Sequence, residues 1–333
     1  MTFTRILFFF ISFVSISTWA FAQESRPVAV KDRFSGRIEL GLLGITTDSA
    51  SSGIDERGFF GQDGDLSLIS DLAGGKSFKT FGTMFLLFDV NYTLNDDTTL
   101  YIGTPFFDDN REGLTFGCEK LFNDNSNLDV SLFFGERSLW KDPYLTNEKR
   151  EITYSDSLGL TIDYEGLLGT ELNIGYTLRH ENVKDDVAGN ADSDLERSGT
   201  NHTLKTGYNF YLNDMFDSML TPSLLAVHDD IDGGANAYYS YGTELAYSMD
   251  QDNNSLMLTL SVENATYDEI HPIFDRKRKQ TTYTATCFYT RKNLWNDRWY
   301  SRIGFAYDHM DSNISFFDEN NFLYGVSLGY AFH

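Results

Sequence analysis

The chain ends in the stretch FLYGVSLGYAFH, residues 322–333, and this stretch decides the fold class. Its even-numbered positions, from Phe322 to Phe332, are all apolar or aromatic, and its odd-numbered positions are mostly small. Because successive side chains of a β-strand point to opposite faces, this alternation gives one apolar face and one semi-polar face. Such a strand is typical of a membrane β-barrel, with its apolar face towards lipid. A strand of a soluble β-sandwich has the same alternation, so the rest of the chain must decide.

The same alternation recurs along most of the chain. The segments in which every second residue is mainly apolar are 34–46, 78–94, 100–102, 114–118, 128–134, 158–164, 172–178, 204–212, 220–227, 239–247, 256–262, 283–289, 299–307 and 322–332. Together they predict an all-β fold, a single transmembrane antiparallel up-and-down β-barrel of about fourteen strands. Counts of twelve or sixteen stay open, because 218–230 is a weak segment and its Pro222 indicates a bulge or the barrel rim.

The connections between these segments alternate in length. Short polar turns lie near Asp96, Asn125, Gly166, Asp214, Asp252 and Asn296. Longer and more acidic loops, such as 182–198 and 269–277, lie between them. This alternation is typical of periplasmic turns and extracellular loops. Aromatic residues near both ends of the segments, such as Trp299 and Tyr239, are expected to form two interfacial girdles.

Residues 1–22 have the features of a secretory signal peptide. A positive charge precedes the apolar run 6–16, and the small-x-small sequence AFA at 20–22 predicts a cleavage site. Residues 23–33 would form a short periplasmic N-terminal segment, too short for a plug domain, and 34–333 would form the barrel. No later stretch has the ~20 apolar residues of a membrane helix. We therefore predict export to the outer membrane of a Gram-negative bacterium.

Composition supports strands and argues against one class of partner. The 333 residues include 28 Phe and 19 Tyr but only 5 Pro, which favours β-structure. A formal net charge of −23 argues against nucleic-acid binding, which needs a basic surface. Cys118 and Cys287 fall on the apolar faces of strands that are distant in order, so we expect both thiols to be free.

If the apolar positions face lipid, the positions between them line the lumen. The charged residues predicted to line it are Asp89, Glu119, Asp129, Asp163, Glu171, Arg179, Lys205, Glu244, Glu263 and Arg302. Acidic residues outnumber basic ones in this set, which gives a negative wall with a mild preference for cations or neutral solutes. The alternative is that these charges only keep the lumen hydrated.

A basic run interrupts the acidic chain where an outer loop meets a strand. It consists of Arg276, Lys277, Arg278 and Lys279. At that height it would contact the phosphates of lipopolysaccharide through charge-assisted hydrogen bonds; a solvated charge run is the alternative. The expected partners are outer-membrane lipid and lipopolysaccharide, small solutes, and the barrel-assembly machinery, which would bind the C-terminal strand.

Signals for catalysis and for metal binding are weak. The chain lacks the G-x-S-x-G, Gly-rich phosphate-binding, H-E-x-x-H and paired C-x-x-C motifs. Asp308 and His309 are adjacent, so on a strand they point to opposite faces and form no dyad. His228 and Asp230 share a face, which is the outward one. We expect neither an enzyme nor a cofactor; the acidic segment 229–233 is predicted to be a turn, with a calcium site as the alternative.

The longest predicted outer loop, 47–76, is expected to fold inward and narrow the lumen. Apolar residues recur in it at a spacing of three: Leu66, Ile69 and Leu72. With Asp65 as N-cap and Gly74 as part of a stop, this spacing predicts a short helix. A helix this short needs a supporting surface. The apolar lumen-side residues that offer one are Phe85, Leu87 and Phe133. The alternative is an external loop over the barrel rim.

Four passages resemble one protein family. They are FSGRIELGLL at 34–43, SLWKDPY at 138–144, TPSLLAVHDDIDGGANAYYSYGTEL at 221–245 and SNISFFDENNFLYGVSLGYAF at 312–332. They are similar to a proteobacterial family of exported proteins classed as a domain of unknown function. The resemblance implies a β-barrel-like envelope protein and implies no activity or site residue. A closing strand that ends on an aromatic residue also resembles the C-terminal signal of outer-membrane barrels, although His333 follows Phe332.

Two functions agree with these observations. The first is a porin-like channel for passive uptake of small hydrophilic solutes, with a mild cation preference. The alternative is a structural or surface-binding outer-membrane barrel, closed by its loops, without transport or catalysis. Because fourteen strands leave a channel unless loops occupy it, the position of the loops decides between the two.

Overall fold

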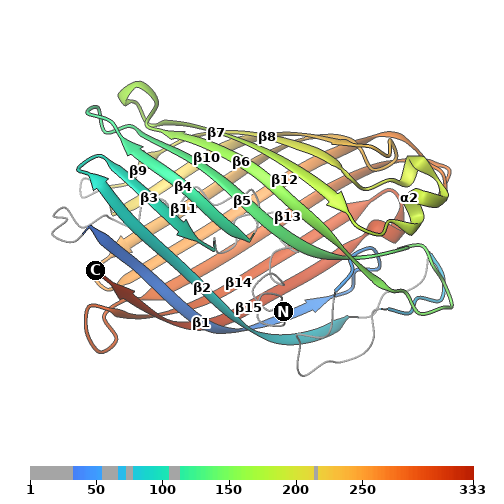
Figure 1. Ribbon diagram of the computed structural model, residues 1–333, viewed down its shortest axis with the longest axis horizontal. Coiled ribbons are helices and arrows are strands. Elements are labelled where there is room, and N and C mark those ends of the chain that lie inside the picture. The colour runs from blue at the N-terminus through green and yellow to red at the C-terminus, as the bar shows by residue number, and fades with distance from the viewer. Residues whose placement is uncertain (1–32, 55–66, 73–77, 105–112, 214–216) are drawn as a thin grey trace.

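The structure is a computed structural model that describes residues 33–54, 67–72, 78–104, 113–213 and 217–333 (Figure 1). The predicted signal peptide and nearly all of the predicted periplasmic segment lie outside these ranges. The described residues form an all-β barrel of fourteen antiparallel strands, counting β8 and β9 as one strand. This confirms the predicted fold class and strand number.

Each strand pairs with the next in the sequence, and β15 pairs with β1 to close the barrel. The strands are β1 (Phe34–Thr47), β2 (Lys79–Asn95), β3 (Thr98–Gly103), β4 (Leu114–Leu121), β5 (Asn127–Trp140), β6 (Ile152–Glu165), β7 (Leu172–Val183), β8 (Gly199–Tyr208), β9 (Phe210–Tyr211), β10 (Ser218–Ile231), β11 (Tyr238–Gln251), β12 (Asn254–His271), β13 (Arg276–Arg291), β14 (Trp299–Ser312) and β15 (Glu319–Phe332). The helical turns are η3 (Leu167–Gly169), α2 (Val187–Ala191), η4 (Ser193–Leu195) and η5 (Ser315–Phe317). Among the described residues, no helix has the length and apolar character needed to cross a membrane.

The two faces of the wall differ as the alternation predicts. On β1, the outward residues Ile38 and Leu40 are 47% and 52% exposed, whereas Glu39 between them is 2% exposed. Outward leucines, isoleucines and phenylalanines recur on the other strands. An apolar outer surface around a polar interior is the arrangement of a barrel that spans a membrane. Cys118 and Cys287 are free, as predicted.

The strand formed by β8 and β9 is interrupted at Asn209, opposite Thr221 and next to the position that faces Pro222. β8 and β9 pair with β10 in one continuous register, so the interruption at Asn209 inserts no extra residue. Pro222 has no N–H to donate to the ladder. Asn209 uses its side chain instead, and its Oδ1 accepts hydrogen bonds from Thr221 Oγ1 at 2.8 Å and Asn173 Nδ2 at 3.0 Å. The bulge predicted at Pro222 is therefore absent, and the only irregularity here among the described residues is the interruption at Asn209.

The two ends of the barrel differ in the length of their connections. At one end, here called the short-turn end, the connections are 96–97, 122–126, 166–171, 212–217, 252–253 and 292–298. At the other, the long-loop end, they are 48–78, 104–113, 141–151, 184–198, 232–237, 272–275 and 313–318. Figure 1 shows α2 at the long-loop end and the C-terminus near the opposite end.

The helix predicted within 47–76 is absent from the part of that loop that the structure describes. Residues 67–72 are irregular, and 55–66 and 73–77 lie outside the described residues. The reason is a non-local partner, because the carbonyls of Ser67 and Ile69 accept hydrogen bonds at 2.8 Å from the N–H groups of Arg150 and Asn147. A helix would need those carbonyls for its own bonds.

The apolar residues of this loop pack on other loops. Ile69 and Leu72 contact a buried cluster of Ala50, Ile314, Phe316 and Phe317 at the long-loop end. Two of the wall residues predicted to receive them, Phe85 and Phe133, are instead buried against glycines of neighbouring strands. The loop therefore contributes to a cover made of several loops.

Inward aromatic rings lie flat on the wall where the neighbouring strand has a glycine. A Cβ added at Gly159 would lie 1.9 Å from Phe133 Cζ, and one added at Gly41 would lie 2.3 Å from Phe85 Cζ. Such distances are far below van der Waals contact, so only glycine fits beneath each ring. These pairs fill the inside of the wall and hold neighbouring strands in register.

Replacement of Gly159 by valine is expected to displace Phe133 and destabilise the barrel by about 1–3 kcal/mol, as overpacking does. The measurement is the temperature at which the purified protein loses its folded, faster migration on a gel. Leu158→Val on the lipid-facing side of the same strand is the control and should change that temperature little. Equal effects of the two substitutions would contradict the role given to Gly159.

Candidate functional site

The inner wall contains a hydrogen-bonded carboxylate that connects β1 with β14 and β15. Glu39 accepts hydrogen bonds from Tyr300 Oη at 3.0 Å and from Arg302 Nη1 at 3.1 Å, and also from the hydroxyl of Ser327. Glu39 and Arg302 are both nearly fully buried. Arg302 was predicted to face the lumen; Glu39 was missed, although its position between Ile38 and Leu40 gives it the same parity.

A second buried ion pair crosses the inner surface of β10. Lys205 Nζ on β8 lies 2.7 Å from Glu244 Oε1 on β11, and both side chains are at most 4% exposed. Both residues were predicted to line the lumen, but their contact was not, because β8 and β11 are not neighbours in the sheet. Paired in this way, the two charges cancel each other within the wall.

A charged belt runs from β5 to β15 along the inner wall, in the half of the barrel nearer the long-loop end. It consists of Arg137 on β5, Arg179 and Glu181 on β7, Asp229 on β10, Glu263 on β12, Asp308 on β14 and Glu319 on β15. Of these, only Arg179 and Glu263 were predicted. The others have inward parity too, but they lie beyond the apolar runs from which the parity was derived.

The two sides of the charged belt differ in sign. On β5 and β7, Glu181 pairs with Arg137 and with Arg179, whose Nε lies 3.0 Å from Glu181 Oε1. On the other side, the acids bind neutral donors: Ser240 donates to Glu263 at 2.6 Å and Thr284 donates to Asp308 at 2.8 Å. The belt therefore has a compensated basic arc and an acidic arc.

The remaining predicted wall residues lie nearer the short-turn end. They are Asp89, Glu119, Asp129 and Asp163, on β2, β4, β5 and β6. Each has a partner there: for example, Tyr101 Oη donates to Asp129 at 2.8 Å and Asn127 Nδ2 donates to Glu119 at 2.8 Å. Charge compensation or hydrogen bonding thus extends along the whole inner wall.

Two predicted site residues do not lie where the sequence placed them. Glu171 precedes β7 in the turn after η3, where its carbonyl accepts a hydrogen bond from Asn209 N–H at 3.0 Å, so it is not on the wall. Arg278 faces inward and is 9% exposed, with its guanidinium 3.7 Å from the centre of the Phe317 ring. Alternation along β13 explains this, because Lys277 and Lys279 point outward. The surface part of the basic run is therefore Arg276, Lys277 and Lys279, all exposed.

The long-loop end carries a loop assembly, here meaning the described parts of the long-loop connections. Three small apolar cores hold it together, centred on Phe316 and Phe317, on Trp140 and Phe81, and on Leu195. Burial of aromatic side chains is the main source of stability in such clusters. The loops are thus packed together as a tertiary structure.

Arg150, in the connection 141–151, binds the first long loop, 48–78. Its Nη1 donates to the carbonyls of Ala50 at 2.6 Å and Pro143 at 3.1 Å, and its guanidinium lies 4.3 Å from the centre of the Trp140 ring. The side chain is 2% exposed. Backbone carbonyls and a ring face thus bind this buried cation.

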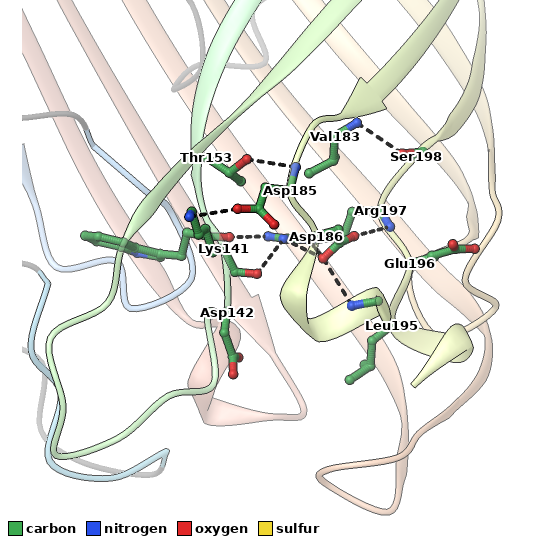
Figure 2. A network of polar contacts seen from close by, with 12 residues as sticks. Lys141, Asp142, Thr153, Val183, Asp185, Asp186, Leu195, Glu196, Arg197 and Ser198 are labelled. Atoms are coloured by element: carbon green, nitrogen blue, oxygen red, sulfur yellow. Dashed lines mark hydrogen bonds and ion pairs between the residues drawn. The ribbon is translucent and has the colours of Figure 1, made fainter. Parts of the chain in front are cut away.

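A second polar connection surrounds α2 (Figure 2). Asp186 caps α2 by accepting from Gly189 N–H at 3.1 Å, and it also accepts from Arg197 Nη2 at 2.6 Å. Arg197 donates further to the carbonyls of Trp140 at 2.7 Å and Lys141 at 3.0 Å. Figure 2 shows Lys141 reaching towards Asp185 in the same network, and Lys141 Nζ lies 2.7 Å from its carboxylate.

A histidine lies buried within the loop assembly. His271, at the tip of the β12–β13 hairpin, is 0% exposed, and its Nε2 is 2.9 Å from Tyr144 Oη. The rings of Tyr144, Phe274 and Phe317 surround it. Burial lowers the pKa of His271 to about 4, and the nearby Arg278 acts in the same direction.

Neither pair considered for catalysis forms a site. One pair lies on the outward face, and the two members of the other lie on opposite faces of the wall. The ring of His228 stacks on Tyr239, 4.1 Å between centroids, on the outward face. Asp308 is buried inward, whereas His309 stacks with Tyr283 on the outside. The described residues contain no group of three or more His, Cys, Asp or Glu side chains that could hold a metal.

Glu244→Gln is expected to destabilise the barrel by about 3–5 kcal/mol, because it removes the carboxylate 2.7 Å from the buried charge of Lys205. Urea unfolding of the purified protein in lipid vesicles measures the effect. The double variant Lys205→Met, Glu244→Leu removes both charges and should recover most of the stability. A small loss in the single variant would show that Lys205 is not held by Glu244.

The loop assembly is expected to loosen in acid. The unfolded pKa of histidine is ~6.5, so below that pH an opened loop takes up a proton that folded His271, with a pKa of about 4, does not. The contribution of His271 to the free energy of opening the loop assembly is therefore greatest above pH ~6.5. It falls, by up to roughly 1.4 kcal/mol per pH unit, towards pH ~4. Hydrogen exchange of loop amides, corrected for intrinsic rates, measures this.

His271→Phe is expected to lose this pH dependence, because phenylalanine fills the site without titrating. His180→Gln, a change at an exposed histidine on β7, is the control and should keep it. Equal pH dependence in wild type and His271→Phe would assign the loosening to other groups.

The chain was compared with known protein sequences, solved structures and protein families. No curated protein sequence matches the chain. Similar solved structures include OccAB1 of Acinetobacter baumannii, with 9% identity, a TM-score of 0.43 and coverage of 90% of this chain and 97% of that one. A FadL homologue of Pseudomonas aeruginosa has 12% identity, a TM-score of 0.41 and coverage of 91% of each chain. OmpT, an outer membrane protein of Vibrio cholerae, has 10% identity, a TM-score of 0.40 and coverage of 92% and 100%.

Likeness at this level concerns the fold and carries no argument about activity. The family comparison is more specific, because a family profile described as "Protein of unknown function (DUF2860)" matches residues 34–331, which is nearly the whole described barrel. The chain therefore belongs to the DUF2860 family.

Proposed function

We propose that this protein is a passive channel for small hydrophilic solutes in the outer membrane of a Gram-negative bacterium, with its long-loop end facing the exterior. The observation that carries the proposal is a fourteen-stranded wall with charged and polar residues along its inner face. Side chains fill barrels of about eight strands, and a wider barrel leaves an aqueous lumen unless loops occupy it. A polar lining along that lumen suits a hydrated solute.

The charged belt supports a mild preference for cations. Glu263, Asp308 and Glu319 bind hydroxyl and amide donors within the described residues, whereas Arg137 and Arg179 are compensated by Glu181. Fixed carboxylates without basic partners raise the local concentration of cations. Lys205 and Glu244 neutralise each other, so neither contributes to the net charge of the lumen wall.

The second candidate is a barrel that its own loops close, with a structural or surface-binding role. The apolar cores of the loop assembly favour it, because loop side chains such as Phe316 and Phe317 are buried at one end. In the channel proposal, the loop assembly narrows the entrance and selects small solutes; in the second proposal, it prevents passage.

The exposed basic residues give the barrel a proposed contact with the outer leaflet. Lys277 and Lys279 point outward on β13, beyond the apolar band, and Arg276 is exposed beside them. Their ammonium and guanidinium groups suit lipid phosphates. Binding of the C-terminal strand by the barrel-assembly machinery remains a proposal of the same kind.

Planar-bilayer recording of the purified protein separates the two functions. Stable conductance steps are expected for a channel. A protein that migrates as folded on a gel and inserts into the bilayer, yet gives no steps, would contradict the channel and favour the closed barrel.

Removal of charge from the acidic arc is expected to weaken cation selectivity. In the double variant Asp229→Asn, Glu263→Gln, the cation-to-anion permeability ratio should fall roughly twofold, because two fixed carboxylates are lost. Reversal potentials in a salt gradient measure the ratio. Glu136→Gln, at an outward position on β5, is the control; an equal change in both variants, or an anion-selective wild type, would contradict the role of the belt.

A further inference from the structure

We propose that Arg278 binds the carboxylate group of a small zwitterionic solute, of the amino-acid class, where the inner wall meets the loop assembly. The inference names a solute class for the proposed channel, and it rests on that function only for the route by which the solute arrives. The site itself is formed by β13 and by the residues packed around it.

Arg278 lies near the long-loop end of β13, on the inner face of the wall, and its guanidinium contacts two aromatic rings. Its Cζ lies 4.3 Å from the centre of the Tyr267 ring on β12 and 3.7 Å from the centre of the Phe317 ring in η5. Ring contacts of this kind attract a guanidinium and fix its orientation. Because Phe317 belongs to a core of the loop assembly, the wall and the loops meet at this cation.

Most of the N–H groups of this guanidinium are unused. A guanidinium has five N–H donors. Among the described residues, Nη2 donates to Gln280 Oε1 and lies 3.8 Å from Met310 Sδ, whereas Nε and Nη1 donate no hydrogen bond. Of these two nitrogens, only Nε is fully enclosed. A ligand at the inner face can therefore reach Nη1.

The lack of a carboxylate partner sets Arg278 apart from other basic residues of the inner wall. Those residues form ion pairs, namely Arg302 with Glu39, Lys205 with Glu244, and both Arg137 and Arg179 with Glu181. In the part of the chain that the structure describes, no carboxylate lies within ion-pair distance of Arg278, which is only 9% exposed. Burial of a cation without an anion is costly. The position therefore favours an anionic ligand.

The shape of the group and the charges around it select the class of ligand. The fork of a guanidinium matches the two oxygen atoms of a carboxylate. The acidic arc flanks β13, with Glu263 on β12 and Asp308 on β14, and it repels a solute of net negative charge. A zwitterion avoids this repulsion, because its ammonium group is attracted by the same carboxylates. A phosphate group with two negative charges is disfavoured for the same reason.

Titration of the purified protein in detergent with L-alanine, followed by ligand-observed NMR, tests the site without requiring conduction. L-Alanine is expected to bind, and L-alaninamide, which lacks the carboxylate, should bind at least about tenfold more weakly. Propionate, which lacks the ammonium group, should also bind more weakly than L-alanine. Absence of L-alanine binding, or equal binding of L-alaninamide, would overturn the site. Equal or tighter binding of propionate would overturn the preference for a zwitterion.

Substitutions of Arg278 assign the binding to this residue. Arg278→Gln is expected to weaken L-alanine binding at least about tenfold, because the charge-assisted hydrogen bonds are lost. Arg278→Lys keeps the charge but loses the planar fork, so it should weaken binding several-fold, and it serves as the test if Arg278→Gln fails to fold. Arg291→Gln, at an exposed arginine on the outer face of the same strand, is the control and should bind as the wild type does. Unchanged affinity in either folded Arg278 variant would overturn the assignment.

The outcomes for this site and for the proposed channel are separate. Binding of L-alanine together with a silent bilayer would support the site and contradict the channel. Conductance steps without binding of L-alanine would support the channel and contradict the site.

Discussion

The pairing of β1 with β15 is the interaction on which the rest of the structure depends. In lipid, an unpaired N–H or C=O group costs several kcal/mol, so a sheet that spans a membrane must have no edge. The ladder from Gly36–Phe332 to Thr47–Asn321 removes the last two edges at once. Closure also gives every strand an inside and an outside. Charges such as Glu39 and Lys205 are then confined to the inside, because the outer face meets hydrocarbon.

A barrel of fourteen strands is wider than its own side chains fill. The wall and the long-loop end of this barrel are stabilised in different ways. Along the wall, carboxylates meet arginine, lysine or hydroxyl groups, and rings such as Phe133 lie flat over glycines. At the long-loop end, aromatic residues from separate loops form small cores, and Arg150 and Arg278 join them through carbonyls and ring faces. The loops thus gain stability by packing on one another.

The fold was predictable because the strand period is local, whereas the contacts that make the site are not. Alternation alone placed Lys205 and Glu244 inside, but their contact depends on barrel curvature across β10. Glu39 was missed although its parity within the run 34–46 places it on the same face as the predicted lumen residues. The helix predicted near Ile69 failed because Arg150, far along the sequence, takes the carbonyls that a helix would use. The prediction placed Arg278 on the outer surface because the alternation of inward and outward side chains was not extended into residues 276–279.

The closing ladder also determines when this protein can fold. Its two strands come from opposite ends of the chain, so no shorter, growing chain has both partners. Folding must therefore await release of the complete chain, and contacts so distant in sequence form slowly. Throughout that delay, long strands with exposed edges are at risk of association with other chains. A net charge of −23 opposes this association through mutual repulsion between chains.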